Sequence, residues 1–352
     1  MHSSMMSPGL RGCAGKPEIC SGTRTLNGMS TPQERSTTPS PPDGVRRVRP
    51  DRSRRRGAGK RFLVIGDVLD GVLVQTSAAS TGDHDPSAVI RHRIVGAGGN
   101  TATWLGWLGA EVDLVARVGV DDVYRHERAL EDAGVRPHIR YDVRSTTGSV
   151  VSMRNERGRT TMSDPAAAGR LTASDVPVEI LARADIVHLT GAGVLAGGGA
   201  DRIAELVALG RSAGAKVSLD PSSTAVVRIV GATAFLDALD GVDVLFPGAD
   251  EARALAGTDD LHDAVRRLTT RVPLVVVTTG TQGALLGRAG RSPHRVAATP
   301  ATVVDTLGAG DAFAAGFLRA WATDPVRVGA AAREGGRVAA RALGFVGGRP
   351  PA

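Results

Sequence analysis

The residues of this sequence best suited to chemistry are a carboxylate and the glycine-rich turn directly before it. Asp311 follows Gly308, Ala309 and Gly310, and an Ala-rich segment at 312–321 predicts a helix after them. N–H groups at the start of a helix lack partners within it and carry roughly half a positive charge, so they can hold a phosphoryl group in transfer. The carboxylate could accept the proton of an attacking hydroxyl. The spacing favours phosphoryl transfer; the alternative is a plain connecting loop with Asp311 as a helix cap.

Short apolar runs alternate with helical segments along the chain, and these elements must position the turn. The runs that predict strands lie at 62–65, 112–116, 186–189, 216–219, 242–246 and 274–277, and helices are predicted at 200–213, 249–257 and 260–270. Strands that alternate with helices predict right-handed βαβ units and a mostly parallel sheet covered on both faces. Val303 and Val304 could end a further strand directly before the turn. Ligands bind at the carboxyl ends of such strands, where the polar motifs of this sequence fall.

The basic charge of the chain is concentrated at its N-terminus. Residues 1–61 hold thirteen Lys and Arg against four Asp and Glu, which leaves 30 basic and 32 acidic residues in the rest. Residues 1–60, rich in Ser, Pro and Arg, predict a disordered tail, because they cannot bury enough apolar surface to fold. A start codon placed too early, a targeting peptide and a basic arm at Arg46–Arg61 are the other interpretations. The nearly neutral remainder, a single domain at 61–350, is not expected to bind nucleic acid.

Two protein classes are excluded by composition. No apolar run approaches the roughly 18 residues that a membrane-spanning helix needs. The two cysteines, Cys13 and Cys20, both lie in the tail, so the domain must fold without disulfide bonds. A folded enzyme or binding protein that acts on small molecules remains.

The segment from Asp305 to Phe313, Asp-Thr-Leu-Gly-Ala-Gly-Asp-Ala-Phe, resembles the C-terminal signature of the ribokinase/PfkB family of carbohydrate and nucleoside kinases. Other family motifs follow in the family's order between residues 62 and 348, at 109–121, 220–221, 246–251 and 276–283. This resemblance implies a ribokinase-like three-layer α/β/α fold with a mostly parallel central sheet. It also implies a small β lid, with strands within about 67–95 and 138–162.

The resemblance also implies roles in phosphoryl transfer. Asp311 would be the catalytic base and would contact the substrate, with Gly308, Ala309 and Gly310 as the anion hole. Thr278, Gly280, Gly283 and Gly310 would line the ATP site.

For the metals, Glu251 would act on Mg²⁺ through water, and Asp305 would belong to a loop at which many relatives bind K⁺. Asn100, after Gly98 and Gly99, would bond substrate hydroxyls; the alternative is a helix N-cap, and both could be true.

The sequence departs from the family mainly where substrate is recognised. Position 71 is Gly where a sugar-binding Asp is usual, and the nearest acids are Asp67 and Asp70. Asp70 would serve only if a bulge or a one-residue slip turned it to the cavity. Ala168 and Gly248 stand where the family usually has polar residues.

The predicted function is that of an ATP-dependent sugar kinase, a phosphotransferase with an alcohol acceptor, using Mg²⁺ and K⁺. The substrate would be a small sugar, the location the cytoplasm, and a homodimer could form through the lid. A nucleoside kinase of the same fold is an alternative, although the chain has only eleven aromatic residues for a base pocket. A sensor that binds sugar or nucleotide without catalysis is another, motivated by the departures at Gly71, Ala168 and Gly248.

Overall fold

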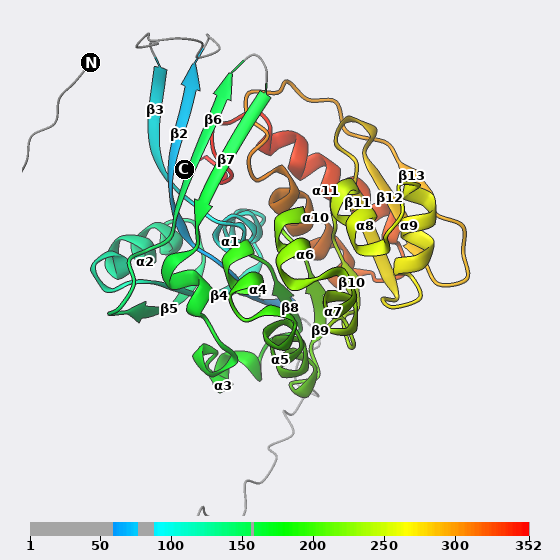
Figure 1. Cartoon of the computed structure of the whole chain (residues 1–352), viewed down its shortest axis with the longest axis horizontal. Helices are drawn as coiled ribbons and strands as arrows, with labels where there is room; N and C mark the ends of the chain where they lie inside the picture. Colours follow the sequence, from blue (N-terminus) through cyan, green and yellow to red (C-terminus); the bar gives the residue numbers. More distant parts are fainter. Residues whose placement is uncertain (1–58, 77–87, 156–157, 352) are drawn as a thin grey trace, which may run out of the picture. The chain divides into compact units, whose positions relative to one another are not determined.

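The computed structural model describes residues 59–76, 88–155 and 158–351 (Figure 1). The predicted tail at 1–60 therefore lies outside the described residues, apart from its last two positions. None of the described helices is long and apolar enough to cross a membrane.

The core of the domain is a nine-stranded sheet in the order β13-β12-β11-β10-β9-β8-β1-β4-β5. Its strands are β1 (Arg61–Ile65), β4 (Glu111–Gly119), β5 (Arg136–Asp142), β8 (Ile186–Leu189), β9 (Lys216–Leu219), β10 (Val244–Leu245), β11 (Leu274–Thr278), β12 (Ala284–Arg288) and β13 (His294–Val296). Every pairing from β5 to β11 is parallel, and β12 and β13 add to the far edge as antiparallel strands.

Helices cover both faces of this sheet because successive strand residues point to opposite sides. In β1, Leu63 and Ile65 belong to one apolar cluster, whereas Phe62 and Val64 belong to the other. The first cluster is covered by α3 (Val178–Leu181), α4 (Ala192–Gly197), α5 (Gly199–Ser212), α6 (Thr224–Val230), α7 (Ala232–Asp237), α8 (Ala249–Ala256) and α9 (Leu261–Leu268). The second is covered by α1 (Ala97–Trp107), α2 (Val123–Glu131), α10 (Ala309–Thr323) and α11 (Val328–Ala342). Short 3₁₀ turns lie at Val120–Asp122, Ala166–Arg170, Ala173–Asp175 and Gly280–Gln282.

A second, smaller sheet stands apart from the large one (Figure 1). Its order is β3-β2-β6-β7, formed by β2 (Leu69–Thr76), β3 (Ala88–Val95), β6 (Ser149–Asn155) and β7 (Gly158–Asp164). We call this sheet the lid. Leu69, Val95 and Val150 of the lid pack with Ala168 and Leu307 of the main body.

The predicted architecture is confirmed, with two local differences. Residues 138–142, expected among the lid strands, belong to β5 at the edge of the large sheet. The predicted strand end at Val303 and Val304 is a loop, and both side chains stay partly exposed. The amide of Val304 instead donates to the carbonyl of Leu343 at 2.7 Å.

Candidate functional site

A cavity of about 680 Å³ opens at the carboxyl ends of the parallel strands. Asp67 follows β1, Asp220 follows β9 and Thr278 ends β11, so the large sheet supplies one wall. The lid supplies the other wall, which includes Val150 and Thr161. The elements therefore place polar groups from distant parts of the sequence around one space.

The glycine-rich turn lies at this cavity and begins α10, as predicted. Gly308 is the N-cap with φ of 73°, a left-handed conformation that favours glycine, and a Cβ there would overlap Gly348. No side chain caps the helix. The amide of Ala309 donates to the carbonyl of Thr306 at 3.4 Å. The amides of Gly310 and Asp311 lie in the first turn and have no partner among the described residues. These two amides are available to an anion in the cavity.

Asp311 lies in the first turn of α10 and lines the cavity. Asn100, on α1, donates from Nδ2 to its carboxylate at 2.7 Å. Burial raises the pKa of Asp311 to about 7, against the opposing effect of the Asn100 hydrogen bond and with a smaller contribution from the charge of Asp67. A carboxyl group with this pKa can accept and release a proton near neutral pH.

Three further acidic residues line the same cavity: Asp67, Asp220 and Glu251. Burial raises the pKa of all three, and the charges of Glu251 and Asp311 raise that of Asp220 further. Glu251, in the first turn of α8, accepts a hydrogen bond from the amide of Gly248.

Magnesium is a hard cation that keeps several waters and binds through one or two carboxylates together with substrate phosphates. Asp220 and Glu251 fit that mode, because both line the cavity and gain from a nearby cation. Within the described residues, no group of three or more His, Cys, Asp or Glu could hold a metal ion. The phosphates of a nucleotide would therefore supply part of the coordination.

The residues predicted to border ATP lie beside this cavity. Thr278 lines it, whereas Gly280 and Gly283 are in the turn between β11 and β12. Gly280 has φ of 58° and Gly283 has φ of 86°, and a side chain on Gly283 would overlap the backbone of Val296. Next to this turn is an open hollow whose lining includes Arg295. Of the residues expected to border ATP, Thr278 and Gly310 line the cavity that holds Asp311.

A model of the pfkB family of carbohydrate kinases matches residues 60–350. The chain belongs to this family. It is a phosphotransferase with an alcohol group as acceptor, as the resemblance implied.

Among curated relatives, the kinase is 38% identical over 150 residues to 1-phosphofructokinase of Rhodobacter capsulatus, matching 40% of this chain and 44% of that protein. It is 32% identical over 240 residues to fructokinase of Klebsiella pneumoniae, matching 63% of this chain and 75% of that one. Its fold is shared with a probable sugar kinase from Rhizobium etli (TM-score 0.71, 22% identity, 83% and 96% covered). Adenosine kinase from Sinorhizobium meliloti is similarly close in fold (TM-score 0.72, 21% identity, 84% and 97% covered).

Asp305 of the kinase is buried in the loop before α10, and its carboxylate is already surrounded by donors. The amides of Leu307 and Gly347 donate to it at 3.1 and 3.0 Å, and Arg159 of β7 forms an ion pair with it. Three N–H donors leave about one free acceptor position on a carboxylate, and the guanidinium repels a second cation. These surroundings do not fit an alkali cation bound at Asp305.

Asp70 is a predicted substrate-binding residue that the structure does not bring to the cavity. The pairing of β2 with β3 is continuous from Leu69 to Thr76, without the slip that would turn Asp70 inward. Its carboxylate is held by Arg125 through two hydrogen bonds of 2.8 and 2.7 Å. A side chain at position 71 would overlap Val95, so the usual position has no room for an acid.

Three cavity or near-cavity residues were missed by the sequence reasoning. Asp67, directly after the first strand and its glycine, lines the cavity, whereas the sequence favours Asp70. Asp220 also lines it, although the sequence marks this residue only as part of a family motif. Gly348 packs against Gly308 and Asn100 and accepts a hydrogen bond from Trp104 Nε1 at 2.9 Å, and only the paired glycines near the C-terminus could have indicated it.

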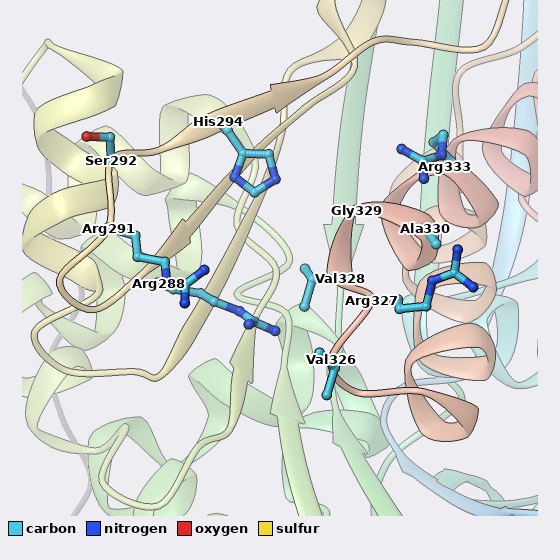
Figure 2. Close-up of a pocket in the computed structure, with 10 residues that line it drawn as sticks. All are labelled: Arg288, Arg291, Ser292, His294, Val326, Arg327, Val328, Gly329, Ala330 and Arg333. Carbon is cyan, nitrogen blue, oxygen red and sulfur yellow. The ribbon is translucent and has the colours of Figure 1, made fainter.

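A second cavity, of about 370 Å³, lies beyond the other end of α10 (Figure 2). Figure 2 shows that one side comes from β12 and the segment after it, with Arg288, Arg291 and His294, and the other from the segment around the start of α11, with Arg327 and Arg333. No Asp or Glu is among its described lining residues. The kinase thus has cavities of opposite charge at the two ends of one helix.

Proposed function

We propose that this kinase transfers the γ-phosphoryl group of ATP to a hydroxyl of an uncharged carbohydrate, with Asp311 as the catalytic base. The observation that carries the proposal is the position of Asp311. Its carboxylate is oriented by Asn100 and stands in the first turn of α10, beside the free amides of Gly310 and Asp311. Base and anion hole therefore share one rigid element.

In the proposed reaction, the acceptor hydroxyl lies against Asp311, which takes its proton as the oxygen attacks the γ-phosphorus. A bond forms between that oxygen and phosphorus, and the bond from phosphorus to the β–γ bridging oxygen breaks. ADP leaves with that bridging oxygen. The first-turn amides of α10 hold the transferred group while negative charge spreads over its oxygens. Asn100 keeps the carboxylate in place and is free to contact the acceptor through Oδ1, which is buried with no protein partner among the described residues.

Magnesium bound with ATP neutralises phosphate charge during transfer. On this chain, Glu251 and Asp220 would hold its water ligands, in agreement with their raised pKa values. Thr278 would lie near the phosphates, and the turn with Gly280 and Gly283 would border the rest of the nucleotide.

The charge of the cavity supports an uncharged acceptor. Four carboxyl groups line it, and none of its described lining residues is Lys, Arg or His. A phosphorylated or carboxylated sugar would bring a second anion to this acidic space without a cation to receive it. The relative named 1-phosphofructokinase, by its name, acts on a phosphorylated sugar, and the proposal separates this chain from it.

A nucleoside kinase is the second candidate, and the lid favours it. Leu69, Val95 and Val150 give the lid side of the cavity an apolar wall, next to Leu307. Such a wall suits a flat base better than a ring of hydroxyls. The ribose hydroxyl of a nucleoside would meet Asp311 in the same way as that of a sugar.

A screen for ADP release, with Mg²⁺ and a panel of neutral sugars, phosphorylated sugars and nucleosides, tests the proposal. We expect turnover with a neutral sugar and none with its phosphorylated form. Turnover confined to nucleosides would favour the second candidate. A flat response across the panel would contradict both and support a binding protein without catalysis.

The lid also supports the expected homodimer. Ile90 on β3, Met153 on β6 and Met162 on β7 share one face of the lid and are 57%, 42% and 53% exposed. A second copy of the lid would cover them. Light scattering should give the mass of a dimer, and Ile90→Lys should give a monomer; a monomeric native protein would contradict this. The cytoplasm, as the location, stays a prediction.

A further inference from the structure

One buried ion pair joins the lid to the loop that carries the anion hole. Arg159 is on β7 of the lid, and Asp305 is in the loop between β13 and α10, 146 residues away. The side chains are 19% and 8% exposed. Figure 1 shows this loop passing near the lid. A buried charge is costly unless it is paired, so the two groups hold each other in place.

The same carboxylate fixes two more segments. Asp305 Oδ1, which receives the guanidinium, also accepts the amide of Leu307, the residue before the helix cap Gly308. Asp305 Oδ2 accepts the amide of Gly347, whose neighbour Gly348 packs against Gly308. The position of the anion hole therefore depends on the charge balance at Asp305.

The family resemblance placed an alkali cation at this loop, where it would balance the carboxylate. Arg159 already supplies one positive charge there, and a guanidinium is charged at every pH at which proteins work. Unlike a dissolved ion, this cation is a side chain of β7 in the lid. Two more arginines, Arg91 and Arg154, line the small cavity beside the pair and would add to the repulsion of a free cation.

We propose that Arg159 is a positioning residue that takes the place of the alkali cation, so that the kinase orders its anion hole without K⁺. The inference rests on the proposed function, because it concerns the same anion hole. It differs from the expectation drawn from the sequence, in which Asp305 binds K⁺.

The first experiment compares turnover, with a sugar found in the screen, in KCl and in choline chloride at equal ionic strength. We expect the turnover of the native protein in the two salts to differ by less than about twofold. Arg159→Ala should lose about 10-fold or more in choline chloride, because a small displacement of a catalytic loop can cost as much as about 100-fold. Added K⁺ should restore part of that loss, since the substitution frees the carboxylate of Asp305. The matched control is Arg154→Ala, which removes the arginine paired with Arg159 across the lid sheet but no described ion pair with Asp305.

Arg159→Lys tests whether any positively charged side chain at this position can replace K⁺. This variant should keep more activity than Arg159→Ala, and its turnover should be the same in KCl and in choline chloride. Thermal unfolding gives a readout that needs no substrate. K⁺ should raise the melting temperature of Arg159→Ala relative to choline, and leave that of the native protein unchanged. A K⁺-specific stabilisation of the native protein, or equal behaviour of Arg159→Ala and Arg154→Ala, would overturn the inference. Because unfolding is independent of turnover, this result stays separate from a failure of the proposed function.

Discussion

The cavities at the two ends of α10 are lined by side chains of opposite charge. At its start, Asp311 and three other carboxyl groups line a cavity that contains no described basic side chain. Beyond its end, four arginines and a histidine line a cavity that contains no described acid. The acidic cavity receives a helix N-terminus with free amides, so it can hold a phosphoryl group although its side chains repel anions. Under the proposed function, backbone groups and not side-chain cations receive the transferred phosphate, whereas net charge alone would have pointed to the arginine-lined cavity.

The largest effect should come from the base. Asp311→Asn keeps the size of the side chain and one acceptor oxygen for Asn100, but it cannot accept the proton, so turnover should fall about 10³-fold. Binding of MgATP, measured by calorimetry, should stay within a few fold of the native protein. Retained turnover would show that the acidic cavity does not act through Asp311.

The charge of the acceptor should have the next largest effect. We expect kcat/KM for a neutral sugar to exceed that for its phosphorylated form by about 100-fold or more, because like charges in a partly desolvated site cost several kcal/mol. Steady-state kinetics on matched pairs of sugars measures this ratio. A preference for the phosphorylated sugar would contradict the proposal that the acidic cavity binds an uncharged acceptor.

The pH dependence of kcat/KM tests the role of Asp311 in the acidic cavity. The pKa of Asp311 is raised to about 7, so kcat/KM should rise with pH and level off above about 7, once the base is deprotonated. Asp67→Asn removes a negative charge that raises this pKa, so the midpoint should move to lower pH. Asp70→Asn is the matched control: Asp70 lies outside the cavity, bound by Arg125, so the midpoint should stay in place. A midpoint that moved with Asp70 and not with Asp67 would return Asp70 to the site.

The smallest effect should come from the basic cavity. Arg288 donates to the carbonyl of Pro325 at 3.1 Å and lies at the opposite end of α10 from Asp311. Arg288→Ala should change kcat/KM by less than about twofold, as surface substitutions away from a site usually do. A large loss would show that the arginine cavity takes part in phosphoryl transfer.

Much of this account could be predicted from the sequence because the main elements are locally encoded. The apolar runs at 62–65 and 274–277 lie in β1 and β11, and the glycines before Asp311 predicted the cap of α10. These features depend on neighbouring residues, so the chain itself reveals them.

The features of the site that the sequence did not reveal depend on contacts between segments far apart in the chain. The register of β2 against β3 turns Asp70 away, whereas Asp67, in the segment between β1 and β2, lines the cavity. The ion pair of Arg159 with Asp305 joins residues far apart in sequence, and no local pattern marks it. The acidic character of the cavity, too, is visible only when the carboxyl ends of several strands are brought together.

The most direct measurement is a crystal structure of the kinase with Mg²⁺, a non-hydrolysable ATP analogue and the acceptor found in the screen. The account predicts an acceptor hydroxyl within about 3 Å of the Asp311 carboxylate. It also predicts γ-phosphate oxygens bonded to the first-turn amides of α10. A γ-phosphate bound elsewhere, or an acceptor whose hydroxyls all lie away from Asp311, would contradict it.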